Sequence, residues 1–152
     1  MSDENEKQPM STAVALIFID NYDEVMNTLE EFRRPIVIAL AERRLNKIAG
    51  DLGGFLRGFE KDKYLLVFSA EKLSYLMETK FECFNAVSDA DKNVPIPLTL
   101  SIGVGVRGET LANTMEYARA AVDLALSRGG EQIIVRDGEN NVFFGEIGRA
   151  HV

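Results

Sequence analysis

The sequence predicts an α+β fold, in which helices flank one mixed central β-sheet. Short apolar runs of strand length alternate with longer segments whose apolar residues recur every three or four positions. Two strand-like runs, residues 55–59 and 64–69, are separated only by a charged turn, which is typical of a hairpin. A hairpin inside an alternating series of strands and helices indicates a sheet with both antiparallel and parallel pairs.

The first half of the chain predicts one strand and two helices before the hairpin. Residues 12–20, TAVALIFID, form a nearly continuous apolar run, as expected of a strand that is buried on both faces. Residues 23–32 have helical spacing of their apolar side chains. Pro35 interrupts this helix and suits the first turn of a second helix over residues 36–51, which Gly53 then ends.

The second half predicts a helix over residues 71–87, a strand over residues 98–104, a helix over residues 110–127 and short strands at residues 132–136 and 140–145. The order of elements is close to the ferredoxin-like plan, which is built from a β-α-β-β-α-β unit.

The strand around residue 100 has two different faces. Large apolar side chains occupy one face, and Thr99, Ser101, Gly103 and Gly105 occupy the other. Because these residues are small, either a helix or a ligand could approach that face closely.

Composition excludes several classes of function. The 152 residues carry a net charge of −7, which argues against a nucleic-acid surface. The single cysteine, Cys83, forms no internal disulfide and is expected to be a small buried side chain in a reducing compartment. One histidine, His151, excludes a zinc site built from His and Cys. No apolar run reaches the roughly 18–20 residues that span a bilayer. We therefore expect no direct membrane insertion by this chain.

Composition also predicts the domain limits. Residues 1–11 are polar and without periodicity, as expected of a flexible leader or linker. Residues 12–145 form the predicted domain. Residues 146–152 are interpreted as a linker to a following domain that is absent from this chain.

Three stretches in this order resemble the GGDEF domain of diguanylate cyclases. LTLSIGVGV (98–106) is similar to the family's SIGVA strand, and ARAAVDLALSRGGEQIIV (118–135) aligns without a gap on its closing helix and strand. KDKYLLVF (61–68) aligns on the strand that carries the signature. The resemblance covers roughly residues 13–136 and implies a nucleotidyl-cyclase-like fold.

The residues that the resemblance expects for cyclase chemistry are missing. The GGDEF loop falls on Glu60-Lys61-Asp62-Lys63-Tyr64, without the glycines that let the backbone approach a nucleotide. The first metal-binding acid of the family falls on Phe18, and the guanine-contacting asparagine on Met26. The two phosphate-contacting cations fall on Leu126 and Gly130. Because a cyclase must neutralise two triphosphates, we expect no diguanylate cyclase activity.

The stretches DKYLLVF and ALSRGGEQ resemble more narrowly the divergent GGDEF domain of membrane-bound cyclic-di-AMP phosphodiesterases. In those proteins this domain lies between a PAS domain and a DHH/DHHA1 phosphodiesterase module. The resemblance implies that these are neighbouring domains of the same polypeptide. It also implies a regulatory role for this domain, with weak ATP hydrolysis. The chain would then be a soluble cytoplasmic fragment of a parent protein that is anchored in the cell membrane.

Five residues form the candidate site. Asp20 and Asp62 are the candidate magnesium ligands, and Asn21, Lys61 and Lys63 are candidate contacts to ATP. The two acids come close only if their strands are neighbours. The alternative is structural: Asp20 caps the next helix, Asp62 is a turn residue and the lysines are solvated.

Two functions remain open from the sequence. The first is a degenerate GGDEF domain that binds ATP with magnesium and regulates a phosphodiesterase. The second is a ligand-free coupling or dimerisation module between a sensor domain and a phosphodiesterase domain, which could form a homodimer. Two acids and two lysines are compatible with both functions.

Overall fold

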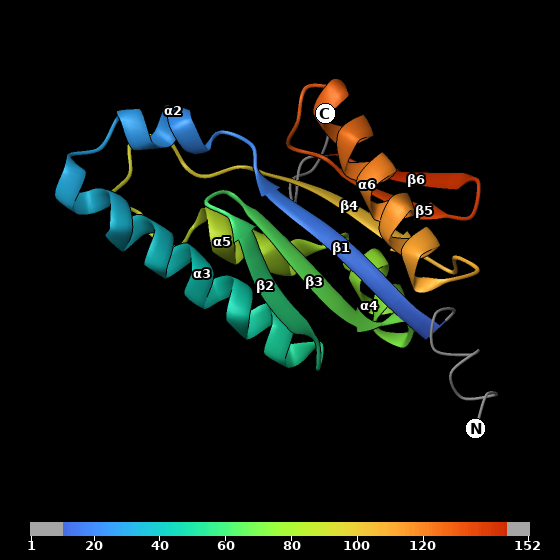
Figure 1. Cartoon of the computed structure of the whole chain (residues 1–152). Coiled ribbons are helices and arrows are strands. Elements are labelled where there is room, and N and C mark those ends of the chain that lie inside the picture. The colour runs from blue at the N-terminus through green and yellow to red at the C-terminus, as the bar shows by residue number, and fades with distance from the viewer. Residues whose placement is uncertain (1–10, 146–152) are drawn as a thin grey trace.

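Residues 11–145 of the computed structural model are described here, and they form a six-stranded sheet with helices on both faces (Figure 1). The strands are β1 (Thr12–Ile19), β2 (Phe55–Glu60), β3 (Lys63–Ser69), β4 (Leu100–Val106), β5 (Ile133–Asp137) and β6 (Asn140–Phe144). The α-helices are α2 (Tyr22–Asn27), α3 (Arg34–Asp51), α4 (Leu73–Glu78), α5 (Asn85–Ser88) and α6 (Leu111–Ser127). The 3-10 turns are η1 (Glu31–Arg33), η2 (Ala70–Lys72) and η3 (Glu82–Phe84).

The strand order is β2-β3-β1-β4-β5-β6, with β1 near the centre of the sheet. β1 pairs antiparallel with both β3 and β4, whereas β4 and β5 are parallel and are joined through α6. The predicted mixed sheet of an α+β fold is therefore confirmed. From β1 to β4 the structure has the two predicted helices between β1 and β2 and the predicted hairpin of β2 and β3, but two short helices, α4 and α5, between β3 and β4 where one was predicted. The four strands keep the sequence order of the ferredoxin-like plan.

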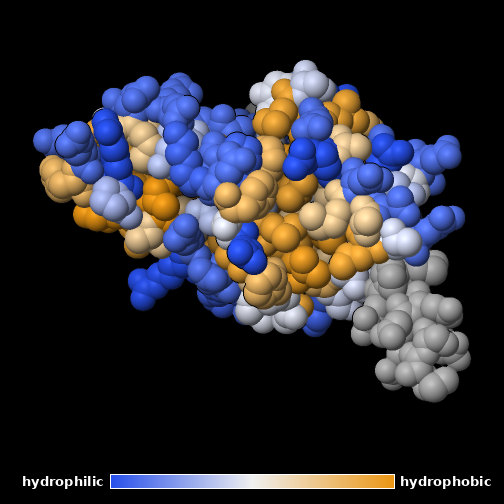
Figure 2. All heavy atoms as spheres, in the orientation of Figure 1, coloured by the Kyte–Doolittle hydropathy of each residue, from blue (hydrophilic) through white to orange (hydrophobic). Residues whose placement is uncertain are grey.

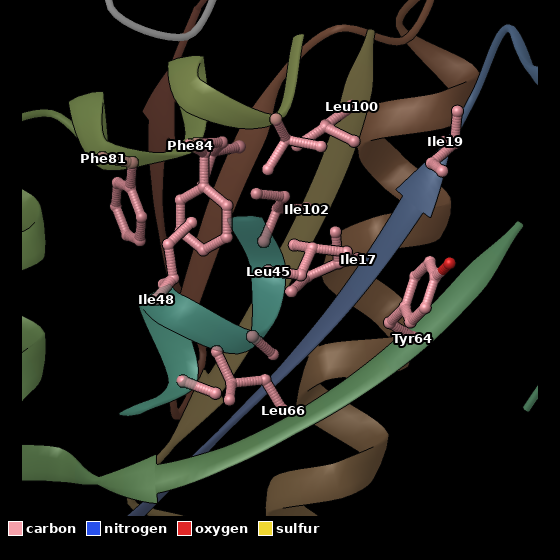
Figure 3. Close-up of a cluster of buried hydrophobic side chains, with 14 of the residues drawn as sticks. Ile17, Ile19, Leu45, Ile48, Tyr64, Leu66, Phe81, Phe84, Leu100 and Ile102 are labelled. Atoms are coloured by element: carbon pink, nitrogen blue, oxygen red, sulfur yellow. The ribbon is translucent and has the colours of Figure 1, made fainter. Parts of the chain in front are cut away.

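Side chains on β1 alternate between two hydrophobic cores. Ala15 and Ile17 belong to the larger core, which α3, α4 and α5 cover on one face of the sheet. Figure 3 shows part of this core: Ile17, Ile19, Leu45, Ile48, Tyr64, Leu66, Phe81, Phe84, Leu100 and Ile102. Val14 and Leu16 face the opposite way, toward Ala118 and Val122 of α6. The prediction of a strand buried on both faces is confirmed.

The small face of β4 is occupied by α6. A Cβ atom on Gly103 would lie 2.2 Å from the backbone nitrogen of Val122, and one on Gly105 would lie 2.1 Å from the carbonyl oxygen of Thr114. Real Cβ atoms do not come this close, so only glycine permits α6 to lie at this depth. The sequence left open whether a helix or a ligand approaches these glycines. In the structure the helix α6 does so.

The predicted helix over residues 23–32 is wrong in its second half. α2 ends at Asn27, and Phe32 is 65% exposed rather than packed in the core. The side chain of Thr28 donates to the carbonyl oxygen of Val25, and Arg34 Nε donates to that of Met26. These side chains satisfy the last carbonyls of α2, so the helix ends without a further turn.

The predicted helix over residues 71–87 is also interrupted. α4 ends at Glu78, and Lys80 and Phe81 then adopt left-handed φ values of 54° and 57°. This turn redirects the chain and places both Phe81 and Phe84 in the core. Helical spacing persists across the break, so the apolar pattern alone does not reveal it. The predicted linkers fall almost entirely on residues 1–10 and 146–152, which lie outside the described residues.

Candidate functional site at the end of β1

The hairpin turn that carries the GGDEF-like loop lies beside the end of β1. β2 ends at Glu60 and β3 begins at Lys63, so Lys61 and Asp62 form the turn. The carbonyl oxygen of Asp62 accepts a hydrogen bond of 2.9 Å from the backbone N–H of Ile19. The two strands are neighbours, as a shared site for Asp20 and Asp62 requires.

The Asp20 carboxylate is held by three groups of this chain. The hydroxyls of Thr99 and Ser101 each donate to it, and the backbone N–H of Glu131 donates at 2.8 Å. A partly buried carboxylate with three donors has most of its acceptor capacity occupied. In this arrangement Asp20 ties the end of β1 to β4 and to the loop after α6.

Asn21 also makes structural bonds. Its side-chain amide donates to the carbonyl oxygen of Pro97 at 2.9 Å, and its side-chain oxygen accepts from the backbone N–H of Thr99 at 2.9 Å. The same side chain thus fixes the segment that enters β4. Asp20 and Asn21 together align this segment with the end of β1.

The two candidate lysines are both ion-paired. Lys61 Nζ lies 3.2 Å from Asp23 and 5.0 Å from the ring centroid of Tyr22. Lys63 Nζ lies 3.1 Å from Glu60 and 3.3 Å from Asp62. The hydrogen bond to Glu60 raises the pKa of Lys63 above its ordinary value.

Lys63 Nζ also lies 5.1 Å from the ring centroid of Phe18. In the resemblance to diguanylate cyclases, Phe18 aligns with their first metal-binding acid. The ring of Phe18 meets Phe59 edge-on at 6.4 Å between centroids. An apolar contact therefore fills this position.

The last residue of the GGDEF-like loop belongs to the core. Tyr64 is 2% exposed, and its hydroxyl donates to Glu42 Oε2 of α3 at 2.8 Å. Burial, followed by this hydrogen bond, raises the pKa of Tyr64. Tyr64 therefore anchors the hairpin to α3 and does not reach toward a ligand.

A cavity of about 460 Å³ lies at the end of β1. Its charged lining residues are Asp20, Glu24 and Glu131, and no lysine or arginine from the described part of the chain lines it. Its other lining residues are Asn21, Thr99, Leu126, Gly129 and Gly130. Lys61, Asp62 and Lys63 do not line it. Within residues 11–145, no three His, Cys, Asp or Glu side chains are arranged to hold a metal ion.

The role of Glu131 at this site was not predicted from the sequence. Its backbone N–H points at Asp20 because Gly129, Gly130 and Glu131 all have positive φ, with values of 105°, 79° and 56°. The two glycines are a recognisable signal for such a turn, but a glutamate with positive φ is not. The place of Ser101 could have been predicted, because the alternation of side chains in β4 puts it on the same face as Thr99, the face with small residues.

Comparison with known proteins assigns the family. Residues 17–143 match the family model described as "Cyclic-di-AMP phosphodiesterase GdpP-like, GGDEF domain". The chain belongs to this family. It is 33% identical over 143 residues to the cyclic-di-AMP phosphodiesterase PdeA of Listeria monocytogenes, covering 93% of this chain and 22% of that protein. It is 32% identical over 133 residues to the cyclic-di-AMP phosphodiesterase GdpP of Bacillus subtilis, covering 88% of this chain and 20% of that protein. This GdpP-like GGDEF domain thus spans about a fifth of the length of these relatives.

Solved structures confirm the GGDEF fold. A diguanylate cyclase/phosphodiesterase from Caldicellulosiruptor saccharolyticus matches with a TM-score of 0.71 and 16% identity, covering 92% of this chain and 85% of that one. The GGDEF domain of DgcB from Caulobacter crescentus, solved with c-di-GMP, matches with a TM-score of 0.68 and 18% identity. That match covers 88% of this chain and 82% of the DgcB chain. None of the helices in residues 11–145 has the length and apolar character needed to cross a bilayer.

Proposed function

We propose that this GdpP-like GGDEF domain is a regulatory domain of a cyclic-di-AMP phosphodiesterase. The observation that carries the proposal is the family match over residues 17–143, together with relatives about five times as long as the matched region. The catalytic hydrolysis would take place in a DHH/DHHA1 module of the same polypeptide, and a PAS-like domain would supply the signal. Anchoring of the parent protein in the cell membrane is part of the same proposal.

The cavity at the end of β1 supports the view that this domain has no diguanylate cyclase activity. Its charged lining residues are all acidic, and Leu126 and Gly130 stand there at the positions that the resemblance assigns to phosphate-binding cations. A triphosphate whose charge is not offset by a metal ion would be repelled in this cavity by Asp20, Glu24 and Glu131. We expect no c-di-GMP when the chain is incubated with GTP and magnesium or manganese, as followed by chromatography.

The regulatory role is tested in a longer polypeptide that contains the phosphodiesterase module. Cyclic-di-AMP hydrolysis is compared between that polypeptide and a version from which residues 12–145 are replaced by a flexible linker of equal reach. If this domain is regulatory, the two polypeptides should differ in their rate of cyclic-di-AMP hydrolysis or in how that rate responds to the sensor domain. Identical rates and responses for a folded deletion variant would rule out a regulatory role.

We propose separately that ATP with magnesium binds weakly beside Asp20, with slow hydrolysis. The supporting observation is the cavity of about 460 Å³, which falls within the range of about 300–1,000 Å³ usual for ligand pockets. Asp20, Asn21, Lys61 and Lys63 are engaged in bonds within the chain. As arranged, they do not form a preorganised magnesium–nucleotide site, so any binding must exchange these bonds and is expected to be weak.

Calorimetric titration with a non-hydrolysable ATP analogue, with and without magnesium, tests the nucleotide proposal. Asp62→Ala is the informative variant: Asp62 does not line the cavity, but with Asp20 it is a candidate magnesium ligand from the sequence, and the loss of this turn side chain spares the core. Asp51→Ala, at the exposed end of α3, is the matched control. Magnesium-dependent binding that only Asp62→Ala removes supports the site and justifies an assay of phosphate release. Absence of binding at millimolar ligand leaves the ligand-free coupling module as the function of this domain.

A further inference from the structure

An apolar groove of about 560 Å³ lies on the sheet face that carries α6. Leu16 of β1 and Leu65 of β3 line it, Met115 lines it from α6, and Phe59 lines it from β2. Figure 2 shows the corresponding hydrophobic area over β1 and β3, beside α6. This groove is separate from the cavity at Asp20, since the two share no lining residue.

The groove has the width of one helix. α6 packs mainly on β4, β5 and β1, which leaves β2 and β3 as the outer part of this face. Strands are spaced about 4.8 Å apart, so two of them present a strip about 10 Å wide. An α-helix with its side chains is roughly 10–12 Å in diameter. A further helix could therefore lie beside α6 on the same face.

Apolar side chains are exposed along this strip. Phe55 and Phe59 on β2 are 59% and 44% exposed, and Leu65 and Val67 on β3 are only partly buried. A row of large apolar side chains on an outer strand is unfavourable in water and marks a surface that another element covers.

The charges around the groove indicate the chemistry of that element. Arg57 of β2 and Arg119 of α6 line it, and within residues 11–145 neither has an ion-pair partner. Among the residues of 11–145 that line the groove, the two arginines outnumber the acids, of which there is one, Glu116. The groove therefore has a local positive charge in a chain whose net charge is −7.

We propose that this groove binds an amphipathic α-helix from outside residues 11–145, with an apolar stripe against the sheet and acidic side chains facing Arg57 and Arg119. The concave shape suits a helix better than a membrane surface, which contacts convex, protruding side chains. α3 of a second copy is disfavoured as the occupant because its exposed face carries Arg43 and Arg44, and those cations would meet the arginines of the groove.

The test uses two synthetic peptides of about 18 residues, which span roughly 27 Å as helices. Both carry leucines at helical spacing; one has glutamates along the flanks and the other has lysines. Binding to the fluorescently labelled peptides is measured by anisotropy. We expect the acidic peptide to bind about tenfold more tightly, because two attractive contacts replace two repulsive ones. The double variant Arg57→Glu, Arg119→Glu should reverse this preference.

The control is Arg43→Glu, Arg44→Glu, which makes the same change of charge on the far side of the sheet and should keep the preference for the acidic peptide. Phe59→Glu should weaken the binding of both peptides, because it removes an apolar contact from the groove. Equal affinity for the two peptides, no binding of either, or a control that also reverses the preference would overturn the proposal. So would a dimer in light scattering that Phe59→Glu dissociates, or stronger binding to phosphatidylglycerol vesicles than to the acidic peptide.

Discussion

The carboxylate of Asp20 accepts a hydrogen bond of 2.8 Å from the backbone N–H of Glu131, a residue 111 positions later in the chain. The same carboxylate accepts from the hydroxyls of Thr99 and Ser101. One acidic side chain therefore joins the end of β1, the start of β4 and the turn that leads into β5. Asp20 therefore stabilises the fold at the end of β1, and this role does not depend on whether a nucleotide binds there.

Asp20→Ala is expected to destabilise the domain by about 3 kcal/mol, because three donors lose a charged acceptor. Asp23→Ala is the matched control: it removes the exposed ion pair with Lys61 and a carboxylate in the first turn of α2, each worth at most about 1 kcal/mol. Urea unfolding at constant m-value measures both changes. Equal losses for the two variants would contradict the structural role of Asp20.

Gly103→Ala is expected to cost about 3 kcal/mol, since its Cβ would lie 2.2 Å from the backbone of α6. Gly50→Ala is the control within the same protein. Gly50 lies near the end of α3 with open space around it, so alanine there should stabilise the domain by roughly 0.5–1 kcal/mol. Thermal unfolding gives the sign of each change. A stable Gly103→Ala protein would mean that α6 does not lie at this depth.

The buried hydroxyl of Tyr64 makes stability depend on pH above about 10. Because burial raises the pKa of Tyr64, the unfolded chain releases its proton first as the pH rises. The unfolded state then binds fewer protons than the folded state. Stability is therefore complete below the unfolded pKa and falls above it, by at most about 1.4 kcal/mol per pH unit.

Tyr64→Phe should flatten this part of the profile in urea titrations between pH 9 and pH 11. Tyr75→Phe removes a hydroxyl from a side chain that is 57% exposed, so its profile should follow that of the unmodified chain. A profile that is unchanged by Tyr64→Phe would show that the Tyr64 hydroxyl is not held as the structure places it.

Cys83 is expected to react slowly with thiol reagents. Burial raises the pKa of its thiol to about 11, against about 8.5 for a free cysteine. At pH 8 the thiolate is thus roughly two hundredfold less populated than in an unfolded chain. Alkylation should be roughly two hundredfold slower in the folded protein than in 6 M guanidinium. Equal rates in the two conditions would place Cys83 in an ordinary exposed environment.

Much of the fold could be predicted because its strongest signals are local. The run at residues 12–20 and the alternation in β4 identify the strands, and Gly103 and Gly105 indicate a close approach. The break at Phe81 could not be predicted, because the apolar side chains keep helical spacing through it. Whether a chain continues as a helix there depends on the shape of the core, which is not encoded in a single segment.

The candidate site was harder to predict because its chemistry depends on pairings between distant residues. The sequence places Asp20 at the end of a strand but does not show that the backbone of Glu131 turns toward it. Lys61 could equally have met solvent, a phosphate or an acid, and in the structure it meets Asp23. Side-chain partners of this kind are set by the turn geometry and by the order of the strands.

The place of β1 has a consequence for biosynthesis. Among the six strands of residues 11–145 it is the first to be synthesised, yet its two neighbours come from residues 63–69 and 100–106. A nascent chain therefore holds its most apolar strand without either partner until much of the domain has been made, and the cost of closing these long loops precedes any gain from pairing. Once β3 is made, β2, β3 and β1 can form one half of the sheet, but one edge of β1 stays unpaired in any chain that stops before residue 100. β4, β5 and β6 are then added at that edge in the order of their synthesis.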